Sequence, residues 1–141
     1  MASAVPLLLV IASVVALGVT DNLFMLSPLV IAVQAAAIGL SIWARRSFQK
    51  GAFRVTATPG GSSIIRNGPY RFVRHPMYAA ALLFVWAAVA SHVSVFTVAV
   101  GLAVSGIAIA RVVVEERLLR ARYSEYEDYA RSTRALVPYV F

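Results

Sequence analysis

Long apolar blocks separated by short polar segments constrain the fold of this chain more than any other feature. Residues 2–19, 23–43 and 77–90 contain no charged side chain, and residues 93–114 contain one, Arg111. About 20 consecutive apolar residues suffice for a helix to cross the hydrocarbon core of a bilayer. The 141 residues are 60% hydrophobic and only 13% charged, which is too apolar for an ordinary soluble domain. The pattern predicts an all-α integral membrane protein.

The four blocks predict about four transmembrane helices in a single domain, residues 1–141. Residues 1–44 would supply two N-terminal spans, and residues 45–141 a polar loop, a helical hairpin and a tail. No basic residue precedes Arg45, so the first block lacks the charged start of a secretory signal and is interpreted as a retained span. The third block is short and reaches the far interface only if it starts at the membrane surface or the bilayer thins locally.

The distribution of basic residues predicts the orientation in the membrane. They are concentrated in the loop at residues 45–76 and in the tail, while the turns at 20–22 and 91–92 carry none. By the positive-inside rule, both termini and the loop lie in the cytoplasm, which in a bacterium makes this an inner-membrane protein. The formal net charge of +7 is explained by residues that flank apolar spans, so nucleic acid is not expected as a partner.

The supply of reactive side chains excludes several kinds of site. The chain has no cysteine, so disulfides, thiolate metal sites and a cysteine nucleophile are excluded. Its two histidines, His75 and His92, are too few for a zinc centre without carboxylates, so no metal site is expected. His92 falls in a turn and is interpreted as a solvated loop residue without a partner.

Smaller features carry further structural predictions. Residues 53–58 alternate and residues 64–65 are again β-branched, which predicts a short hairpin or an extended lid over the membrane face. Residues 111–128 form a strongly helical run, so we expect the fourth helix to continue into the cytoplasm or to bend onto the surface. Gly101 and Gly106 predict close helix packing, and Gln34 a bond to a neighbouring helix.

The polar segment at residues 67–78 is the strongest candidate for a functional site. It contains two arginines, a histidine and two tyrosines, and it lies between two apolar blocks. Placing polar groups at a membrane boundary costs free energy, so such groups indicate a functional site. Asn67, Gly68 and Pro69 form a turn signal. Pro76 favours the first turn of a helix and keeps His75 out of helical conformation, so His75 is expected where that helix begins. The N–H groups of a first helical turn favour an anionic part of a ligand.

The predicted hairpin brings a second polar cluster to this segment. Arg111 and Glu115 are four residues apart and share a helix face, and the end of the fourth helix lies beside the start of the third. We therefore expect His75, Tyr78, Arg111 and Glu115 to converge near the inner membrane interface. A plain interfacial anchor, with arginines for anionic lipid and tyrosines for the aromatic belt, is the alternative that spacing alone leaves open.

These motifs resemble those of a known enzyme family. Residues 68–78 read Gly-Pro-Tyr-Arg-Phe-Val-Arg-His-Pro-Met-Tyr, and a Glu-Glu-x-x-Leu motif follows at 115–119, then a tyrosine-rich helix and Leu-Val-Pro at 136–138. In this order the motifs resemble the isoprenylcysteine carboxyl methyltransferases and their bacterial relatives, with phospholipid N-methyltransferases as a more distant branch. The resemblance covers about residues 62–138, and the first two blocks match only as apolar spans.

The resemblance implies a membrane enzyme that binds S-adenosylmethionine in a cytoplasm-facing pocket formed by the hairpin, the preceding loop and a C-terminal helix. Its acceptor would be a lipophilic molecule or prenylated protein that enters from the bilayer. By matching motif positions it implies these cofactor contacts: Tyr70, His75, Pro76, Met77, Tyr78 and Glu115. It also implies that Arg111 positions an acceptor carboxylate. Residues 62–65 lie where the family makes further cofactor contacts, but these residues do not match the family pattern distinctively. Two departures from the family pattern, Ala79-Ala80 and Ser124 in place of glycines, affect the shape of the pocket.

Methyl transfer from a sulfonium to an ionised carboxylate neutralises opposite charges, so it needs no general base and can rest on positioning in a dry site.

Two other functions stay open. Membrane sterol reductases share a related hairpin with an Arg-His motif and bind NADPH, although the pair Glu115 and Glu116 would repel a nucleotide phosphate. A non-catalytic membrane scaffold would bind no cofactor.

Overall fold

The structure is a computed structural model that describes residues 11–12, 14–15, 17–18, 27–47 and 64–136. Helices make up all the regular structure in these residues, and no strand occurs among them, which confirms the all-α prediction. The described residues between 11 and 18 are helical. The elements that follow are α2 (Pro28–Arg46), the short 3-10 helix η1 (Gly68–Arg71), α3 (Pro76–Ser91), α4 (Val95–Arg122) and α5 (Tyr126–Ser132).

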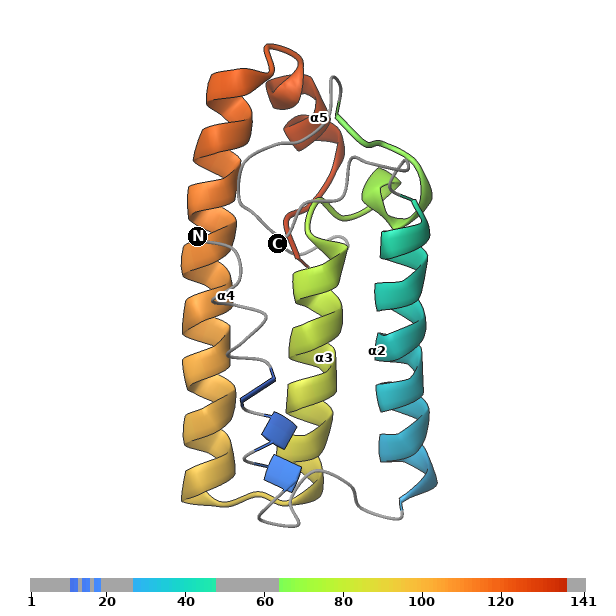
Figure 1. The fold of residues 1–141 in the computed structure, drawn as a ribbon, viewed down its shortest axis with the longest axis vertical. Helices are drawn as coiled ribbons and strands as arrows, with labels where there is room; N and C mark the ends of the chain where they lie inside the picture. The colour runs from blue at the N-terminus through green and yellow to red at the C-terminus, as the bar shows by residue number, and fades with distance from the viewer. Residues whose placement is uncertain (1–10, 13, 16, 19–26, 48–63, 137–141) are drawn as a thin grey trace.

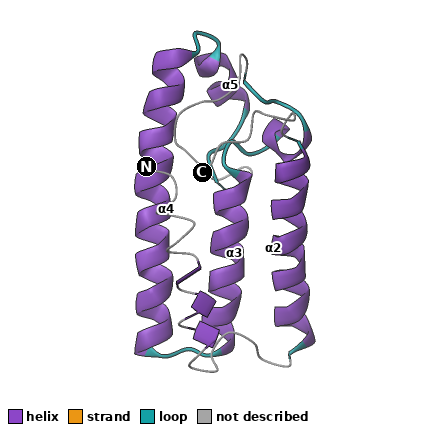
Figure 2. Cartoon of the chain, in the orientation of Figure 1, coloured by secondary structure: helices purple, strands orange, loops and turns teal. Residues whose placement is uncertain are grey.

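The three long helices lie side by side, with α3 between α2 and α4 (Figure 1). The turn between α3 and α4 lies at one end of the molecule, and α5 and η1 lie at the other. Figure 2 shows that the described loops are confined to these two ends. The polar segment at residues 67–78, called the motif segment below, therefore lies at the same end as the C-terminal part of α4, as the predicted hairpin requires.

Local chemistry explains where the helices begin. Pro28 and Pro76 each occupy the first helical position of α2 and α3, where a missing N–H costs nothing. A capping box begins α4: Ser94 Oγ accepts from the N–H of Thr97 at 3.1 Å, and Thr97 Oγ1 accepts from the N–H of Ser94 at 3.0 Å. His92 is not the partnerless loop residue that the sequence suggested, because its Nδ1 lies 3.1 Å from Ser91 Oγ and its carbonyl accepts from Thr97.

Among the described residues, two helices, α2 and α4, are long and apolar enough to cross a membrane. Their large apolar side chains face outward: Leu29 is 73% exposed and Leu102 is 59% exposed, which does not suit a buried core helix. With 28 residues, α4 extends over about 42 Å and exceeds the hydrocarbon thickness of about 30 Å. Helix α3 is apolar but has only 16 residues. Most of the predicted first span lies outside the described residues, so the count of four spans stays a prediction.

The prediction of a helical run over residues 111–128 needs one correction. Helix α4 ends at Arg122, Tyr123 has extended φ and ψ angles of −119° and 114°, and α5 starts only at Tyr126. The break lets α5 fold back over the end of the bundle, where Tyr126 and Tyr129 are 1% and 4% exposed. Burial of two tyrosines outweighs the local preference for a continuous helix, which is worth only tenths of a kcal/mol per residue.

The two glycines of α4 behave differently. A Cβ at Gly101 would lie 3.1 Å from Val89 and 3.4 Å from Trp86, so this glycine does allow α3 to approach α4 closely. Nothing among the described residues lies within 4 Å of a Cβ at Gly106, so no described helix packs closely against this glycine. Near Gly101, the indole of Trp86 donates to Ser105 Oγ at 3.0 Å.

Other sequence predictions meet the structure only in part. Gln34 is 3% exposed and so is buried, while its bond to a neighbouring helix stays a prediction. Residues 53–58, the first half of the predicted hairpin or lid, lie outside the described residues. Ile64 and Ile65 are described and have no strand conformation.

Candidate functional site

The motif segment packs closely against the end of α2 at one glycine. Gly68 has a φ of +58°, which L side chains rarely adopt. A Cβ at Gly68 would also collide with Ser47 Oγ and would lie 3.3 Å from Trp43 Nε1. A glycine is therefore required here twice, for the backbone conformation and for the close approach to α2.

The C-terminal segment holds the other side of the motif. Val73 and Arg134 form a parallel bridge, in which the N–H of Arg74 donates to the carbonyl of Arg134 at 2.7 Å. The N–H of His75 donates to the carbonyl of Ala135 at 3.0 Å. The hydroxyl of Tyr129 in α5 donates to the carbonyl of Tyr70 at 2.6 Å. The backbone around His75 is thus fixed by residues about 60 positions away.

Arg74 joins three parts of the chain. Its Nε donates to Glu116 Oε1 of α4 at 2.8 Å. Its NH1 group donates to the carbonyls of Ala130 and Thr133, at 3.0 and 2.6 Å. Only 11% of each side chain of the Arg74–Glu116 pair is exposed, so this ion pair is largely shielded from water. The motif, α4 and the end of α5 are thereby held in one arrangement.

His75 lies between two consecutive carboxylates. It is the residue before α3, as predicted, and its side chain is 5% exposed. Its Nδ1 lies 3.7 Å from Glu115 Oε2, and its Nε2 lies 3.5 Å from Glu116 Oε1. The Nε2 contact lacks hydrogen-bond geometry, so this buried atom has no hydrogen-bond partner among the described residues. The side chain of His75 does not cap α3.

Glu115 gathers the remaining polar side chains. It accepts a hydrogen bond from the hydroxyl of Tyr78 at 2.6 Å and a longer one from the NH2 group of Arg111 at 3.4 Å. The ring of Tyr78 also meets the ring of His75 edge to face, with centroids 5.9 Å apart. The predicted convergence of these four residues is confirmed, while their roles toward a ligand stay predictions. Glu115, with 21% of its side chain exposed, is the more accessible of the two glutamates.

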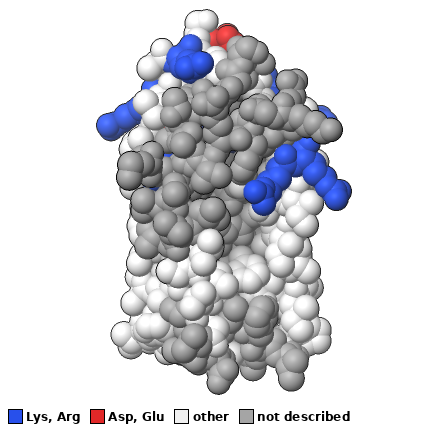
Figure 3. Space-filling view, viewed as in Figure 1, with Lys and Arg blue, Asp and Glu red and all other residues white. Residues whose placement is uncertain are grey.

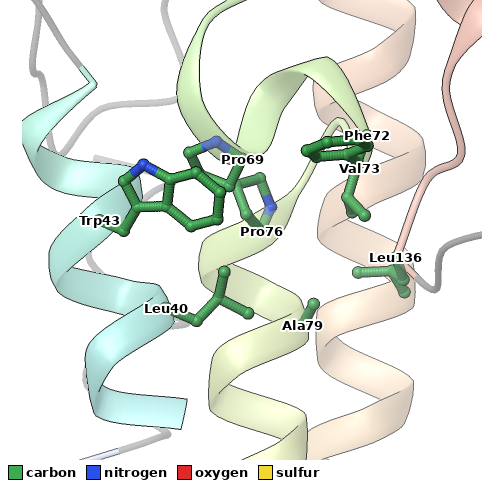
Figure 4. A pocket seen from close by; sticks show the side chains of 8 residues that line it. All are labelled: Leu40, Trp43, Pro69, Phe72, Val73, Pro76, Ala79 and Leu136. Carbon is green, nitrogen blue, oxygen red and sulfur yellow. The ribbon is translucent and has the colours of Figure 1, made fainter. Parts of the chain in front are cut away.

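Three further residues predicted for the cofactor lie around this network. Tyr70 is buried in η1, beneath α5. Met77 is half-buried in the first turn of α3. Pro76 faces an apolar pocket of about 300 Å³ instead of the polar network (Figure 4). The lining residues of this pocket are Leu40, Trp43, Pro69, Phe72, Val73, Pro76, Ala79 and Leu136.

The sequence motifs predicted no separate role for Arg74, Arg120 or Tyr129. Glu116 was grouped with Glu115 as a ligand-facing acid, but it is engaged by Arg74 and by Arg120, whose NH2 group lies 3.3 Å away. Consecutive residues of a helix point about 100° apart, which is the signal that could have separated the two glutamates. The acidity available to a ligand therefore comes from Glu115.

The tyrosines of α5 and η1 carry neutral hydroxyl groups. Burial raises the pKa of Tyr126 to about 12. Burial also raises the pKa of Tyr70 and of Tyr129 well above the ordinary value for tyrosine. Tyr129 accordingly keeps the proton that it donates to Tyr70.

Comparison with known proteins identifies the family. No curated protein and no solved structure matches the chain significantly. The family model described as phospholipid methyltransferase matches residues 22–126, which is more than half of the chain and includes α2, the motif segment, α3 and α4. This match agrees with the outward-facing apolar helices and with the enzyme class that the motifs indicated. The chain therefore belongs to the phospholipid methyltransferase family, a family of membrane methyltransferases, and is an integral membrane protein.

Proposed function

We propose that this protein transfers a methyl group from S-adenosylmethionine to a lipophilic carboxylate at the cytoplasmic face of the membrane. Membership of the family supports membrane methyl transfer in general. The observation that carries the choice of a carboxylate is the state of Arg111, which is shielded from water and has hydrogen-bonding capacity to spare.

The residues around Glu115 suit the methyl donor. S-adenosylmethionine has a cationic sulfonium and ammonium and an anionic carboxylate, and it supplies an electrophilic methyl group. Glu115 would face the cationic part, since it is the partly exposed acid of the network. The first turn of α3 has no side-chain cap, so its N–H groups suit anionic or polar atoms. Tyr78 orients Glu115 through its 2.6 Å hydrogen bond.

Arg111 lies where a lipophilic acid would present its head group. At 1.5 Å per residue it is about 24 Å along α4 from Val95, near the edge of a hydrocarbon core about 30 Å thick. Its side chain is 12% exposed, its bond to Glu115 is long, and its Nε has no hydrogen-bond partner among the described residues. A guanidinium in this state can hold a carboxylate through two parallel hydrogen bonds, but it would repel a cationic amine.

The chain's own residues then need only to bind, orient and exclude water. An ionised carboxylate is already the attacking group, so no side chain has to remove a proton. Arg111 fixes the acceptor and Glu115 fixes the donor beside it, and both belong to one turn of α4. Their shared turn sets the distance between the two reactants. Membership of a methyltransferase family favours this function over the reductase and the scaffold, and no structural observation favours either of those.

Substitution of Arg111 tests the carboxylate assignment. In purified protein, Arg111→Ala should lower methyl transfer to prenyl-thioether acids or fatty acids about 10- to 100-fold, since it removes a charged hydrogen bond. Donor affinity, measured by calorimetry, should change little, and Arg111→Lys should restore transfer only in part. Arg117→Ala is the matched control, because Arg117 is an exposed arginine of the same helix. Transfer to an aminolipid alone, undiminished in Arg111→Ala, would exclude the carboxylate.

A further inference from the structure

The apolar pocket between α2 and α3 is a separate feature of this end of the molecule. Every residue that lines it is uncharged, and the lining includes none of the network residues Arg74, His75, Tyr78, Arg111 or Glu115. Its volume of about 300 Å³ is at the lower limit for ligand pockets. It therefore has room for part of a hydrocarbon chain and not for a whole lipid.

Two aromatic side chains form walls of the pocket and are also open to the outside. Trp43 of α2 is 48% exposed and Phe72, next to η1, is 47% exposed. Figure 4 shows them on different sides of the pocket, Trp43 from α2 and Phe72 from the motif segment. Tryptophan is enriched where a membrane span meets water, and Trp43 lies in the last turn of the span α2. The pocket is thus at the level of lipid head groups.

Each of these aromatic walls is accompanied by an exposed arginine. Arg46 follows Trp43 by three residues on α2 and so shares its face. The guanidinium carbon of Arg71 lies 4.8 Å from the centroid of the Phe72 ring. Figure 3 shows that basic side chains gather toward this end of the molecule, while the visible side chains at the opposite end are uncharged. The pocket therefore combines an apolar interior with two cationic neighbours on different elements.

We propose that this pocket binds an anionic phospholipid of the bilayer, with part of one acyl chain between α2 and α3 and the phosphate at Arg46 and Arg71. Charge complementarity selects this occupant, since neither arginine forms an ion pair among the described residues, and a neutral lipid or an apolar segment of protein would supply no counter-charge at the membrane surface. The proposal does not rest on the methyl-transfer reaction, because binding can be measured without a methyl donor. Pro76 is the one residue shared with the cofactor contacts implied by the motifs, and it is not altered below.

Fluorescence of Trp43 reports directly on the pocket. The chain has two tryptophans, so Trp86→Phe leaves Trp43 as the single emitter. In phosphatidylcholine vesicles, brominated phosphatidylglycerol should quench this emission more than the same fraction of brominated phosphatidylcholine. Equal quenching by the two lipids would overturn the proposal, whether the pocket is then empty or filled by another part of this chain.

Variants in the same background separate binding in the pocket from general attraction to the surface. Arg46→Gln and Arg71→Gln should each reduce the preference for phosphatidylglycerol about fivefold, the effect expected for one arginine beside an anionic lipid. Arg117→Gln, an exposed arginine of α4, should not. Ala79→Phe fills the pocket and should abolish the preference, while Ala103→Phe on the exposed face of α4 should keep it. A preference that survives Ala79→Phe would mean that the arginines only recruit lipid to the surface, and it would refute binding in the pocket.

Discussion

His75 owes its surroundings to two consecutive residues of α4. Because consecutive helical side chains diverge by about 100°, Glu115 and Glu116 can face different nitrogens of one ring only if that ring lies between them, as His75 does. Their remaining partners differ. Glu116 is held by Arg74 and Arg120, whereas Glu115 is held by Tyr78 and more loosely by Arg111. The two adjacent glutamates therefore differ in role: Glu116 pairs with the arginines that hold the structure together, and Glu115 faces the more accessible side of the site.

This difference in role predicts that substitutions at the two glutamates affect different properties, namely donor binding and stability. His75→Ala and Glu115→Ala should each weaken binding of S-adenosylmethionine by about 1–3 kcal/mol, the range for a charged or buried hydrogen bond. Glu116→Gln should chiefly lower thermal stability, because it leaves Arg74 without its ion-pair partner. Calorimetric titration and thermal unfolding in the same detergent compare the two effects. If donor affinity is unchanged in both alanine variants, these residues do not belong to the cofactor site.

At the scale of elements, the C-terminal segment is part of the site and not an appendage. The bridge between Val73 and Arg134 and the bonds of Arg74 hold the motif from the side away from α2. Gly68 holds it from the side of α2. The family match ends at residue 126, so the segment that fixes the backbone of His75 lies beyond the matched range.

Removal of the Arg74 side chain should release this segment. Arg74→Gln breaks a largely buried ion pair and two hydrogen bonds to backbone carbonyls, a loss of about 3–5 kcal/mol for a pair of this kind. Thermal unfolding followed by circular dichroism should show a clearly lower midpoint, and limited proteolysis should cleave the C-terminal segment sooner. Arg131→Gln is the control, because its pair with Asp128 is about 80% exposed on both sides. Equal stability of Arg74→Gln and the wild type would show that the segment is held by other contacts.

At the scale of the whole molecule, the two ends differ in chemistry. The end with α5 carries the polar network, whereas the described residues at the opposite end are the capped turn between α3 and α4 and the start of α2. In the orientation predicted from the basic residues, the network faces the cytoplasm, the side from which the proposed methyl donor would enter.

Labelling of single cysteines tests this orientation. The chain has no cysteine of its own, so each variant carries one reactive thiol. Ser91→Cys at the end of α3, and Asn22→Cys in the predicted first turn, should react with an impermeant maleimide added outside intact cells. Ser132→Cys at the end of α5 should react only after the cells are opened. Labelling of Ser132→Cys from outside would reverse the predicted topology.

The sequence alone determined the features that depend on local chemistry and on the membrane. Apolar blocks must become helices in a bilayer, because every backbone N–H and C=O needs an internal partner there. Pro28 and Pro76 mark helix starts by their missing N–H groups, and His75 was correctly placed before α3. A short hairpin connection then forces the motif segment and the end of α4 together, so the contact of His75 and Tyr78 with Glu115 was predictable.

Only the tertiary structure decided the features that depend on distant residues. The break after Arg122 arises because Tyr126 and Tyr129 become buried when α5 folds back over the bundle, with Tyr129 bonded to η1, which no local preference encodes. The internal engagement of Glu116 requires Arg74, which is 42 residues away in the sequence. Gly101 and Gly106 look alike as small residues of one helix, yet only the first meets α3, because packing depends on which face of α4 the neighbouring helix covers.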